Sequence, residues 1–312
     1  MAQLVEKSMG RDRYFLYLFV CSCFAVGVNA ATEPGLASGW RYLQQHSMSE
    51  LQSQQQALQQ RFARLNAAEA EQLLALELAL QSADQADYQA NLQQVQQAVA
   101  AYQASVQQIE AGWVRADWLN NRWLRLRADA KTAAEQQLFI RTFLEQYEPE
   151  PDLAAKLHKA FAVALQPVKQ QIYRQNQRWL QQQLQAAGWF DISKTSADAS
   201  QAAWLMVQHA DWDPQWQQQV LQLLQPKVKQ GEFQPRYFAY LADRVAINTG
   251  QLQLYGTQGA CDNLSGQWQP FAVANAAQLD LKRQEMELEP IGQYRAKFRC
   301  KSTKPKPQSP SK

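Results

Sequence analysis

The stretch YQANLQQVQQAVAAYQASVQQIE, residues 88–110, determines how the N-terminal half of this chain folds. Its apolar side chains recur at alternating intervals of four and three residues, the heptad spacing of a helix that packs along one face. They are Tyr88, Leu92, Val95, Val99, Tyr102, Val106 and Ile109. Glutamine and alanine fill most other positions, and both are tolerated in helices. The pattern predicts a long helix instead of a disordered low-complexity segment.

A second apolar pattern precedes this helix and predicts a partner for it. Apolar residues recur over residues 58–80, although their spacing slips near Ala68. Ser47 and Glu50 stand at capping-box spacing before this pattern. The polar run SADQAD, residues 82–87, has the composition of a turn. We predict an antiparallel helical hairpin with arms of about 45 Å, at 1.5 Å per residue.

The stretch WVRADWLNNRWLRLR, residues 113–127, interleaves Trp113, Trp118 and Trp123 with arginines. Two interpretations stay open. The stretch could form a basic aromatic face for a membrane surface or an anionic glycan. Alternatively, the tryptophans pack inside and the arginines pair with nearby acids, because tryptophan is costly to leave exposed.

Helix boundaries are visible through the middle of the chain. We expect helices over residues 116–145, 152–165 and 168–187. The proline-containing run YEPEPD ends the first helix, Pro167 breaks or kinks the second, and Gly188 is a C-terminal stop for the third.

The boundaries are clearer after residue 192. Thr195 and Asp198 have capping-box spacing and predict a helix that ends near His209. Asp213 and Pro214 are residue types preferred at the N-cap and first position of the next helix.

A third helix of this region ends at Gly250, and a short strand should follow it. Leu252 and Leu254 alternate with polar residues, and WQPFAV, residues 268–273, is the expected partner strand. Two more helices are expected before Cys300. The predicted fold class is mostly α: an N-terminal antiparallel helical hairpin, then a helical C-terminal domain with a small β-hairpin.

The N-terminus has the pattern of a secretory signal peptide. Lys7, Arg11 and Arg13 precede the apolar run YFLYLFVCSCFAVGV, and the small residue Ala30 follows it. The run of about 15 residues is shorter than the roughly 20 that span a bilayer. A retained anchor or a lipidated Cys23 is the alternative. We expect a periplasmic or secreted protein.

The expected organisation is a signal peptide over residues 1–30, a Gln/Ala-rich helical hairpin over 31–115, a helical domain over 116–300 and a disordered basic tail over 301–312. The net charge is +3, but the two ends supply it, and between them 24 basic side chains face 26 acidic ones. This balance gives no argument for a nucleic acid partner. We expect contact with a membrane only through the signal peptide.

Cys261 and Cys300 are the cysteines that remain after the signal peptide. An even pair in an exported chain favours a disulfide. Such a bond closes a loop of about 40 residues, worth roughly 4 kcal/mol in the chain-entropy description. Two separate buried thiols are the alternative. The spacing does not favour a metal site.

Polar residues of the C-terminal domain form a candidate site. His209 is a candidate general base because imidazole titrates near neutral pH, and Asp211 would orient it. Arg244 would hold an anionic group with two hydrogen bonds. Further candidate ligand-binding residues are Gln208, Tyr255, Thr257 and Gln258.

Two other interpretations of the same residues stay open. His209, Asp211 and Asp213 alternate as metal ligands would on an extended loop, but a continuous helix would place only the first and last on one face. The structural alternative is that Asp213 caps a helix, His209 bonds a carbonyl, and Arg244 pairs with Asp243 or Asp211. The sequence does not identify a cofactor.

Four motifs of this region together resemble a bacterial domain family of unknown function. They are GWFDISK, AAWLMVQHADWDPQWQQ, LADRVAINTGQLQLYGTQ and DLKRQEMELEPIGQY. The resemblance extends over roughly residues 130–298 and includes EQQLFIR and YRQNQRWL. Phe190 stands where that family has proline, and Ser196 where it has glycine. The family's QHADxDP and YGTQ motifs fall on His209, Asp211, Asp213, Arg244, Tyr255 and Gln258. The resemblance implies a mostly α fold and no particular reaction.

We therefore expect an exported protein with a polar ligand-binding pocket, a candidate hydrolase or transferase acting on a polar small molecule. That pocket hypothesis requires His209, Arg244 and Tyr255 to surround one cleft. The alternative is a non-catalytic module that binds an envelope component or self-associates. It requires an exposed apolar stripe over residues 88–109.

Overall fold

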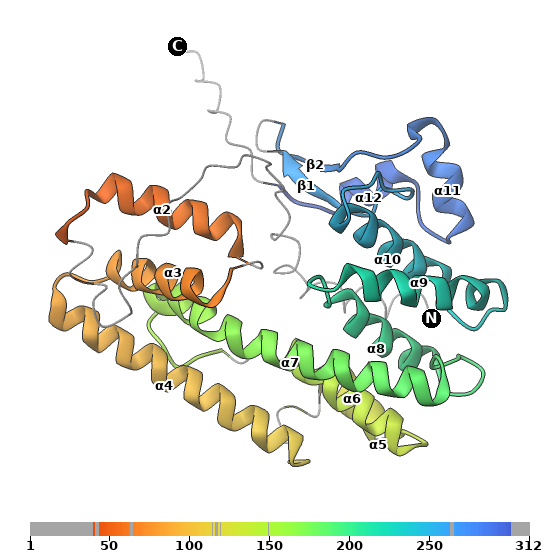
Figure 1. Ribbon diagram of the computed structural model, residues 1–312, viewed down its shortest axis with the longest axis horizontal. Helices are drawn as coiled ribbons and strands as arrows, with labels where there is room; N and C mark the ends of the chain where they lie inside the picture. The colour runs from red at the N-terminus through yellow and green to blue at the C-terminus, as the bar shows by residue number, and fades with distance from the viewer. Residues whose placement is uncertain are drawn as a thin grey trace, which may run out of the picture. The chain divides into compact units, whose positions relative to one another are not determined.

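The computed structural model describes most of the chain (Figure 1). The described residues are 40, 44–62, 65–113, 115, 118, 120–148, 150–262 and 265–300. The predicted signal peptide and the basic tail therefore lie outside them. Among the described residues, no helix has the length and apolar character needed to cross a membrane.

The described part is mostly α-helical, as predicted, and divides into two compact units. The N-terminal unit contains described residues of 40–129 and 139–176, and the C-terminal unit those of 130–138 and 177–300. The division falls within two helices, α6 (Ala133–Gln146) and α7 (His158–Ala187).

In the N-terminal unit the expected first arm is two helices. They are α2 (Met48–Gln60) and α3 (Ala67–Ala79), followed by α4 (Gln85–Glu110). Ser47 and Glu50 form the predicted capping box. A second capping box, Asn66 with Glu69, starts α3 close to the point where the apolar spacing slips.

The apolar stripe of α4 is largely buried. Tyr88, Leu92 and Val95 belong to one core cluster with leucines of α3 and with residues 157, 160 and 163. Further along, Tyr102 stacks on Tyr147 with ring centroids 5.5 Å apart. The exposed stripe that a self-associating hairpin would need is therefore covered within the N-terminal unit.

Two predicted helix boundaries are wrong. The helix expected over residues 116–145 is replaced by α5 (Arg122–Ala128) and α6, because α5 ends at Asp129. The predicted break at Pro167 is also wrong, since α7 is continuous through it. A proline inside a helix removes one hydrogen bond. Burial on both sides of it compensates, through Phe161, Val163, Leu165 and Ile172.

The tryptophans of residues 113–127 divide between the two interpretations. Trp118 and Trp123 are buried, whereas Trp113 is 74% exposed. The Trp123 indole donates a hydrogen bond to Gln146 Oε1 at 2.6 Å, and the Arg122 guanidinium lies 4.8 Å from the Trp123 ring centroid. Packing inside is confirmed for two of the three tryptophans.

The C-terminal unit is built on α8 (Ala197–Gln208), α9 (Pro214–Lys229) and α10 (Pro235–Asn248), which pack together (Figure 1). As predicted, Asp213 is the N-cap of α9 and Pro214 lies in the first turn of that helix. The predicted cap of α8 is wrong by one residue. Ser196 accepts the capping hydrogen bond from Ala199, and the Thr195 hydroxyl bonds the Asp191 carbonyl instead.

The small β-hairpin pairs β1 (Gly259–Asp262) with β2 (Gln267–Pro270) in antiparallel register, with Gly259 opposite Pro270. Of the partner strand expected over residues 268–273, only residues 268–270 lie in a strand, and β2 pairs with β1 instead of with the strand expected at Leu252 and Leu254. There the chain makes one isolated parallel bridge, between Gln253 and Val273. The alternation is real, but it reflects a buried Gln253 between two exposed leucines.

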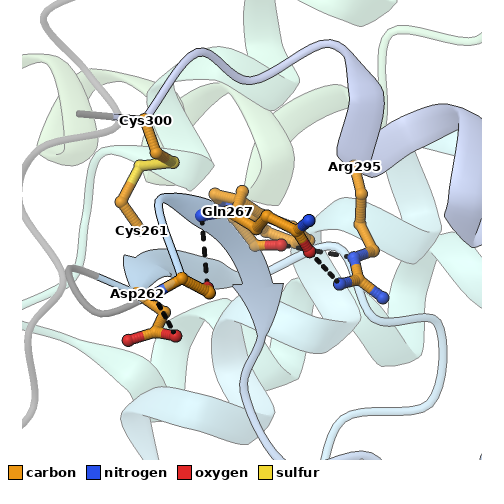
Figure 2. The surroundings of a disulfide bond; sticks show 7 residues. Cys261, Asp262, Gln267, Arg295 and Cys300 are labelled. Atoms are coloured by element: carbon orange, nitrogen blue, oxygen red, sulfur yellow. Dashed lines mark hydrogen bonds between the residues drawn. A yellow bond between two sulfur atoms is a disulfide. The ribbon is translucent and has the colours of Figure 1, made fainter. Parts of the chain in front are cut away.

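A disulfide joins Cys261 of β1 to Cys300, with Cα atoms 5.5 Å apart (Figure 2). The pairing predicted from the sequence is confirmed. Two short helices, α11 (Leu279–Glu285) and α12 (Ile291–Ala296), precede Cys300. Arg295 of α12 donates hydrogen bonds to β2, at the Trp268 carbonyl and the Gln267 side chain (Figure 2).

Candidate functional site

The centre of the candidate site is an ion pair between Asp211 and Arg244. Asp211 lies in the turn between α8 and α9, and Arg244 lies on α10. Arg244 Nε donates to Asp211 Oδ1 at 2.6 Å, and Arg244 Nη2 donates to Oδ2. Asn248, one turn further along α10, donates to Asp211 Oδ1 at 2.9 Å. The Asp211 and Arg244 side chains keep 32% and 20% of their surface exposed.

The Asp211 carboxyl group is held in its ionised form. Burial by itself would raise the pKa of Asp211, but the charge and hydrogen bonds of Arg244 and the Asn248 amide outweigh it. The His209 side chain also lowers the pKa of Asp211. The pKa of Asp211 therefore lies below its ordinary value, and this carboxylate stays ionised as an acceptor.

His209 is the C-cap of α8, and its backbone N–H donates to the Leu205 carbonyl at 3.1 Å. Its side chain is half-buried and close enough to interact electrostatically with Asp211. The structure thus brings together His209, Asp211 and Arg244, three of the residues singled out from the sequence. Asn248 joins them, and the sequence analysis missed it.

Gln208 is the last residue of α8 and is only 7% exposed. Its side-chain oxygen is buried without a hydrogen-bond partner in the described part of the chain. Most buried polar atoms of native proteins have a partner. The Gln208 side-chain oxygen is therefore one of the few buried acceptors whose hydrogen-bonding capacity the fold does not use.

Asp213 has a structural role. Its Oδ1 accepts the Trp216 N–H at 3.0 Å, and its Oδ2 accepts from the Gln177 side chain at 2.8 Å. The Gln177 oxygen in turn accepts from the Trp212 indole at 2.6 Å. Asp211 and Asp213 are thus directed at different partners. Within the described residues no group of three metal-ligating side chains is arranged to hold a metal ion.

A second polar cluster surrounds residues 254–258. Asp243 is fully buried and accepts four hydrogen bonds from this segment. The donors are the N–H groups of Leu254, Tyr255 and Thr257, and the Thr257 hydroxyl, at 2.8–3.0 Å. Burial raises the pKa of the Asp243 carboxyl, although these hydrogen bonds act in the opposite direction. The sequence pattern indicates Asp243 only as an alternative partner of Arg244 and gives no sign of these bonds.

Arg283 holds the same segment from the other side. It is completely buried on α11, and its Nη1 donates to the Tyr255 carbonyl at 2.6 Å. Its guanidinium carbon lies 4.8 Å from the ring centroid of Tyr294, whose hydroxyl donates to the Thr257 carbonyl at 3.1 Å. Gly256 adopts φ +62°, a conformation that favours glycine.

Gln258 is fixed by Gln253. The Gln258 N–H donates to the Gln253 side-chain oxygen at 3.0 Å, and the Gln253 amide donates to the Gln258 carbonyl at 2.9 Å. The predicted ligand-binding residues Tyr255, Thr257 and Gln258 therefore belong to a cluster organised by Asp243, Gln253 and Arg283.

The candidate residues thus form two groups, and α10 carries one anchor of each. Asp243 holds residues 254–257, and its neighbour Arg244 holds Asp211. Successive residues of a helix point about 100° apart. The contacts of Tyr255 are with Asp243 and Arg283, so the arrangement does not by itself create one cleft shared by His209, Arg244 and Tyr255.

Comparison with known proteins agrees with a domain of unknown function. Residues 158–300 match the model described as "Family of unknown function (DUF6624)". The matched residues start with α7 and include both polar clusters, but not the upstream stretch EQQLFIR. No curated protein and no solved structure matches the chain.

Proposed function

We propose that this is an exported protein whose C-terminal unit binds a small polar ligand beside His209, Asp211 and Arg244. The observation that supports this most strongly is the partly exposed ion pair of Asp211 and Arg244. Asp213 caps α9 with its side chain, and His209 ends α8 through its backbone N–H alone, so capping does not account for the side chains of His209 and Asp211. Charged groups that are held rigidly by other side chains and still reach the surface suit the orientation of a ligand.

Binding is better supported than covalent catalysis. Cys261 and Cys300, the cysteines among the described residues, are joined in a disulfide. The Ser193 hydroxyl donates to Glu232 at 2.6 Å, and the Thr257 hydroxyl donates to the buried Asp243. A hydrolase would therefore use a water molecule activated by His209, with Asp211 as the neighbouring carboxylate. In this form of the proposal, the ligand bound beside His209 is also the substrate that the activated water attacks.

Two features support export. The N-terminal residues have the order of a secretory signal, and the disulfide suits an oxidising compartment such as the periplasm. The proposed location is therefore periplasmic or secreted. The interaction-module alternative has less support, because the α4 stripe that it requires is mostly buried within the N-terminal unit.

The test is a thermal-shift screen of the full-length mature protein with polar metabolites and divalent metals, comparing wild type with His209→Ala. His158→Ala is the matched control, because His158 is an exposed histidine whose ring bonds the Leu153 carbonyl at 3.2 Å. We expect a ligand that raises the Tm of wild type and His158→Ala but not of His209→Ala. A shift that persists in His209→Ala would exclude this site.

Catalysis is measured separately on any ligand found in that screen. Mass spectrometry of the incubated ligand should reveal a product with wild type and none with His209→Gln if His209 activates water. An unchanged ligand with both proteins would restrict the function to binding.

A further inference from the structure

The seam between α8 and α10 has polar atoms that the fold does not use. The two helices are joined at both ends of this seam. Trp204 of α8 stacks on Tyr237 of α10 with centroids 4.5 Å apart. Seven residues later in both segments, Asp211, in the turn just after α8, pairs with Arg244 of α10. Gln208 lies one helical turn beyond Trp204 and therefore falls between the two contacts.

Trp204 and Gln208 are both buried, with 9% and 7% exposure. The Trp204 indole nitrogen and the Gln208 side-chain oxygen have no hydrogen-bond partner among the described residues. One atom is a donor and the other is an acceptor. Their positions one turn apart place both on the same face of α8. A hydroxyl group of a ligand can satisfy both kinds of atom, because it donates and accepts.

The neighbouring charges favour an uncharged ligand. Asp211 and Arg244 neutralise each other through two hydrogen bonds. A phosphate or carboxylate would have to compete with Asp211 for Arg244, leaving a partly buried carboxylate without its partner. A neutral ligand can bind at the rim of this pair and leave it intact.

The aromatic residues favour a ring with an apolar face. Tyr237 is stacked on Trp204, and the Tyr240 ring lies 6.4 Å from Trp204, at a tilt of 56°. Saturated rings that carry hydroxyl groups have C–H faces that pack on aromatic rings, while their edges form hydrogen bonds. The combination of aromatic faces, an indole N–H and a side-chain amide matches such a compound.

We propose that the α8–α10 seam binds a neutral, hydroxyl-rich ring compound of the sugar class, with Gln208 and Trp204 bonding its hydroxyls. The inference rests on the proposed function and specifies its ligand. In this structure the Trp204 and Gln208 side chains are buried and Trp204 is stacked on Tyr237, so the proposal includes a separation of Tyr237 from Trp204 when the ligand binds.

The experiment measures thermal shift with neutral sugars, namely glucose, N-acetylglucosamine and myo-inositol, and with the charged analogues glucose 6-phosphate and glucuronate. The variants are Gln208→Met and Trp204→Phe. We expect a neutral sugar to raise the Tm of wild type. Gln208→Met should raise the Tm of the ligand-free protein, because it removes a buried unpartnered oxygen, and abolish the sugar response.

Trp204→Phe removes only the indole N–H and ring bulk and provides an independent measurement. We expect it to weaken sugar affinity by about tenfold, the effect of losing one hydrogen bond. Gln217→Met is the control: Gln217 also has a buried unpartnered oxygen, but on α9. Its sugar response should persist.

The results of these measurements distinguish a failure of the sugar proposal from a failure of the proposed polar site. A sugar response retained in Gln208→Met, or no response to any neutral sugar, overturns the inference. If a charged analogue alone raises the Tm and His209→Ala abolishes that rise, the polar site remains and its neutral sugar ligand is refuted.

Discussion

The buried carboxylate of Asp243 should control the order of residues 254–257. It accepts four hydrogen bonds and is fully buried. Asp243→Asn keeps the shape of the side chain but replaces one acceptor oxygen with an NH₂ donor. If the remaining oxygen keeps the bonds from Leu254 and Tyr255, the new NH₂ group faces the Thr257 N–H, and two donors oppose each other.

The expected loss follows from that geometry. A buried donor left without an acceptor costs about 1–3 kcal/mol, and hydrogen bonds to a charged group are stronger than neutral ones. We expect Asp243→Asn to lower the free energy of unfolding by about 3 kcal/mol in urea titrations. Asp280→Asn is the control, because Asp280 is exposed and accepts one N–H, from Ile291 at 2.7 Å. Its loss should be about 1 kcal/mol or less.

Hydrogen exchange gives the local measurement, since two compact units need not unfold in one transition. The amides of Leu254, Tyr255 and Thr257 should exchange faster in Asp243→Asn than in Asp280→Asn. Equal stability of Asp243→Asn and wild type, together with unchanged exchange of these three amides, would refute the reasoning.

The pH dependence of the same variant has a definite sign. Burial raises the pKa of Asp243 above its ordinary value, so the folded protein binds this proton more readily than the unfolded chain. The contribution of Asp243 to stability therefore falls as the pH rises through the two pKa values. Relative to Asp243→Asn, wild type should gain stability between pH 7 and about pH 4. A gap that narrows on acidification would contradict this sign.

Four further expectations follow from single contacts. A Cβ at Gly259 would lie 2.2 Å from a backbone oxygen, so Gly259→Ala should lower the free energy of unfolding by about 3 kcal/mol. Gly292→Ala, in α12 and with open space around it, should leave the free energy of unfolding unchanged or raise it by up to about 1 kcal/mol. Trp123→Ala should cost about 3–5 kcal/mol and the exposed Trp113→Ala about 0.5 kcal/mol or less in urea titrations. Replacing both cysteines by alanine should cost about 4 kcal/mol, as the disulfide closes a loop with a sequence separation of 39. The lowered pKa of Asp211 means that its stabilisation is present above about pH 4 and is lost as the pH falls through its folded value; Asp211→Asn should therefore lose less stability than wild type between pH 7 and pH 3, measured by urea titration.

Local sequence patterns predicted the features that depend on local chemistry. Ser47 and Asp213 are caps whose partners lie three residues away, so spacing alone identified them. The α4 helix and its buried face followed from heptad spacing, because every turn repeats the same packing requirement. The disulfide followed from counting cysteines.

The features that were missed depend on contacts between distant segments. Asp243 bonds residues 11–14 positions away, and Arg283 bonds Tyr255 at a separation of 28. No local pattern distinguishes such a charged residue from one on a solvated helix face. The strand expected at Leu252 and Leu254 shows the converse error: the alternation predicted buried leucines, but both are exposed and Gln253 between them is buried, because the Gln253 side chain bonds distant backbone groups that no local pattern indicates.

The neighbouring positions of Asp243 and Arg244 explain why one motif region appeared to be a single site. Both residues belong to one turn of α10, but each holds a different segment: Asp243 holds residues 254–257, and Arg244 holds the α8–α9 turn. Asp243 and Arg244 move together because they are neighbours on one helix. A shift of α10 would therefore displace both residues 254–257 and the α8–α9 turn. Ligand binding at the α8–α10 seam should then change the hydrogen exchange of Tyr255 and Thr257 as well as of residues near Asp211. A ligand that protects only the α8–α9 turn would show that the two clusters act independently.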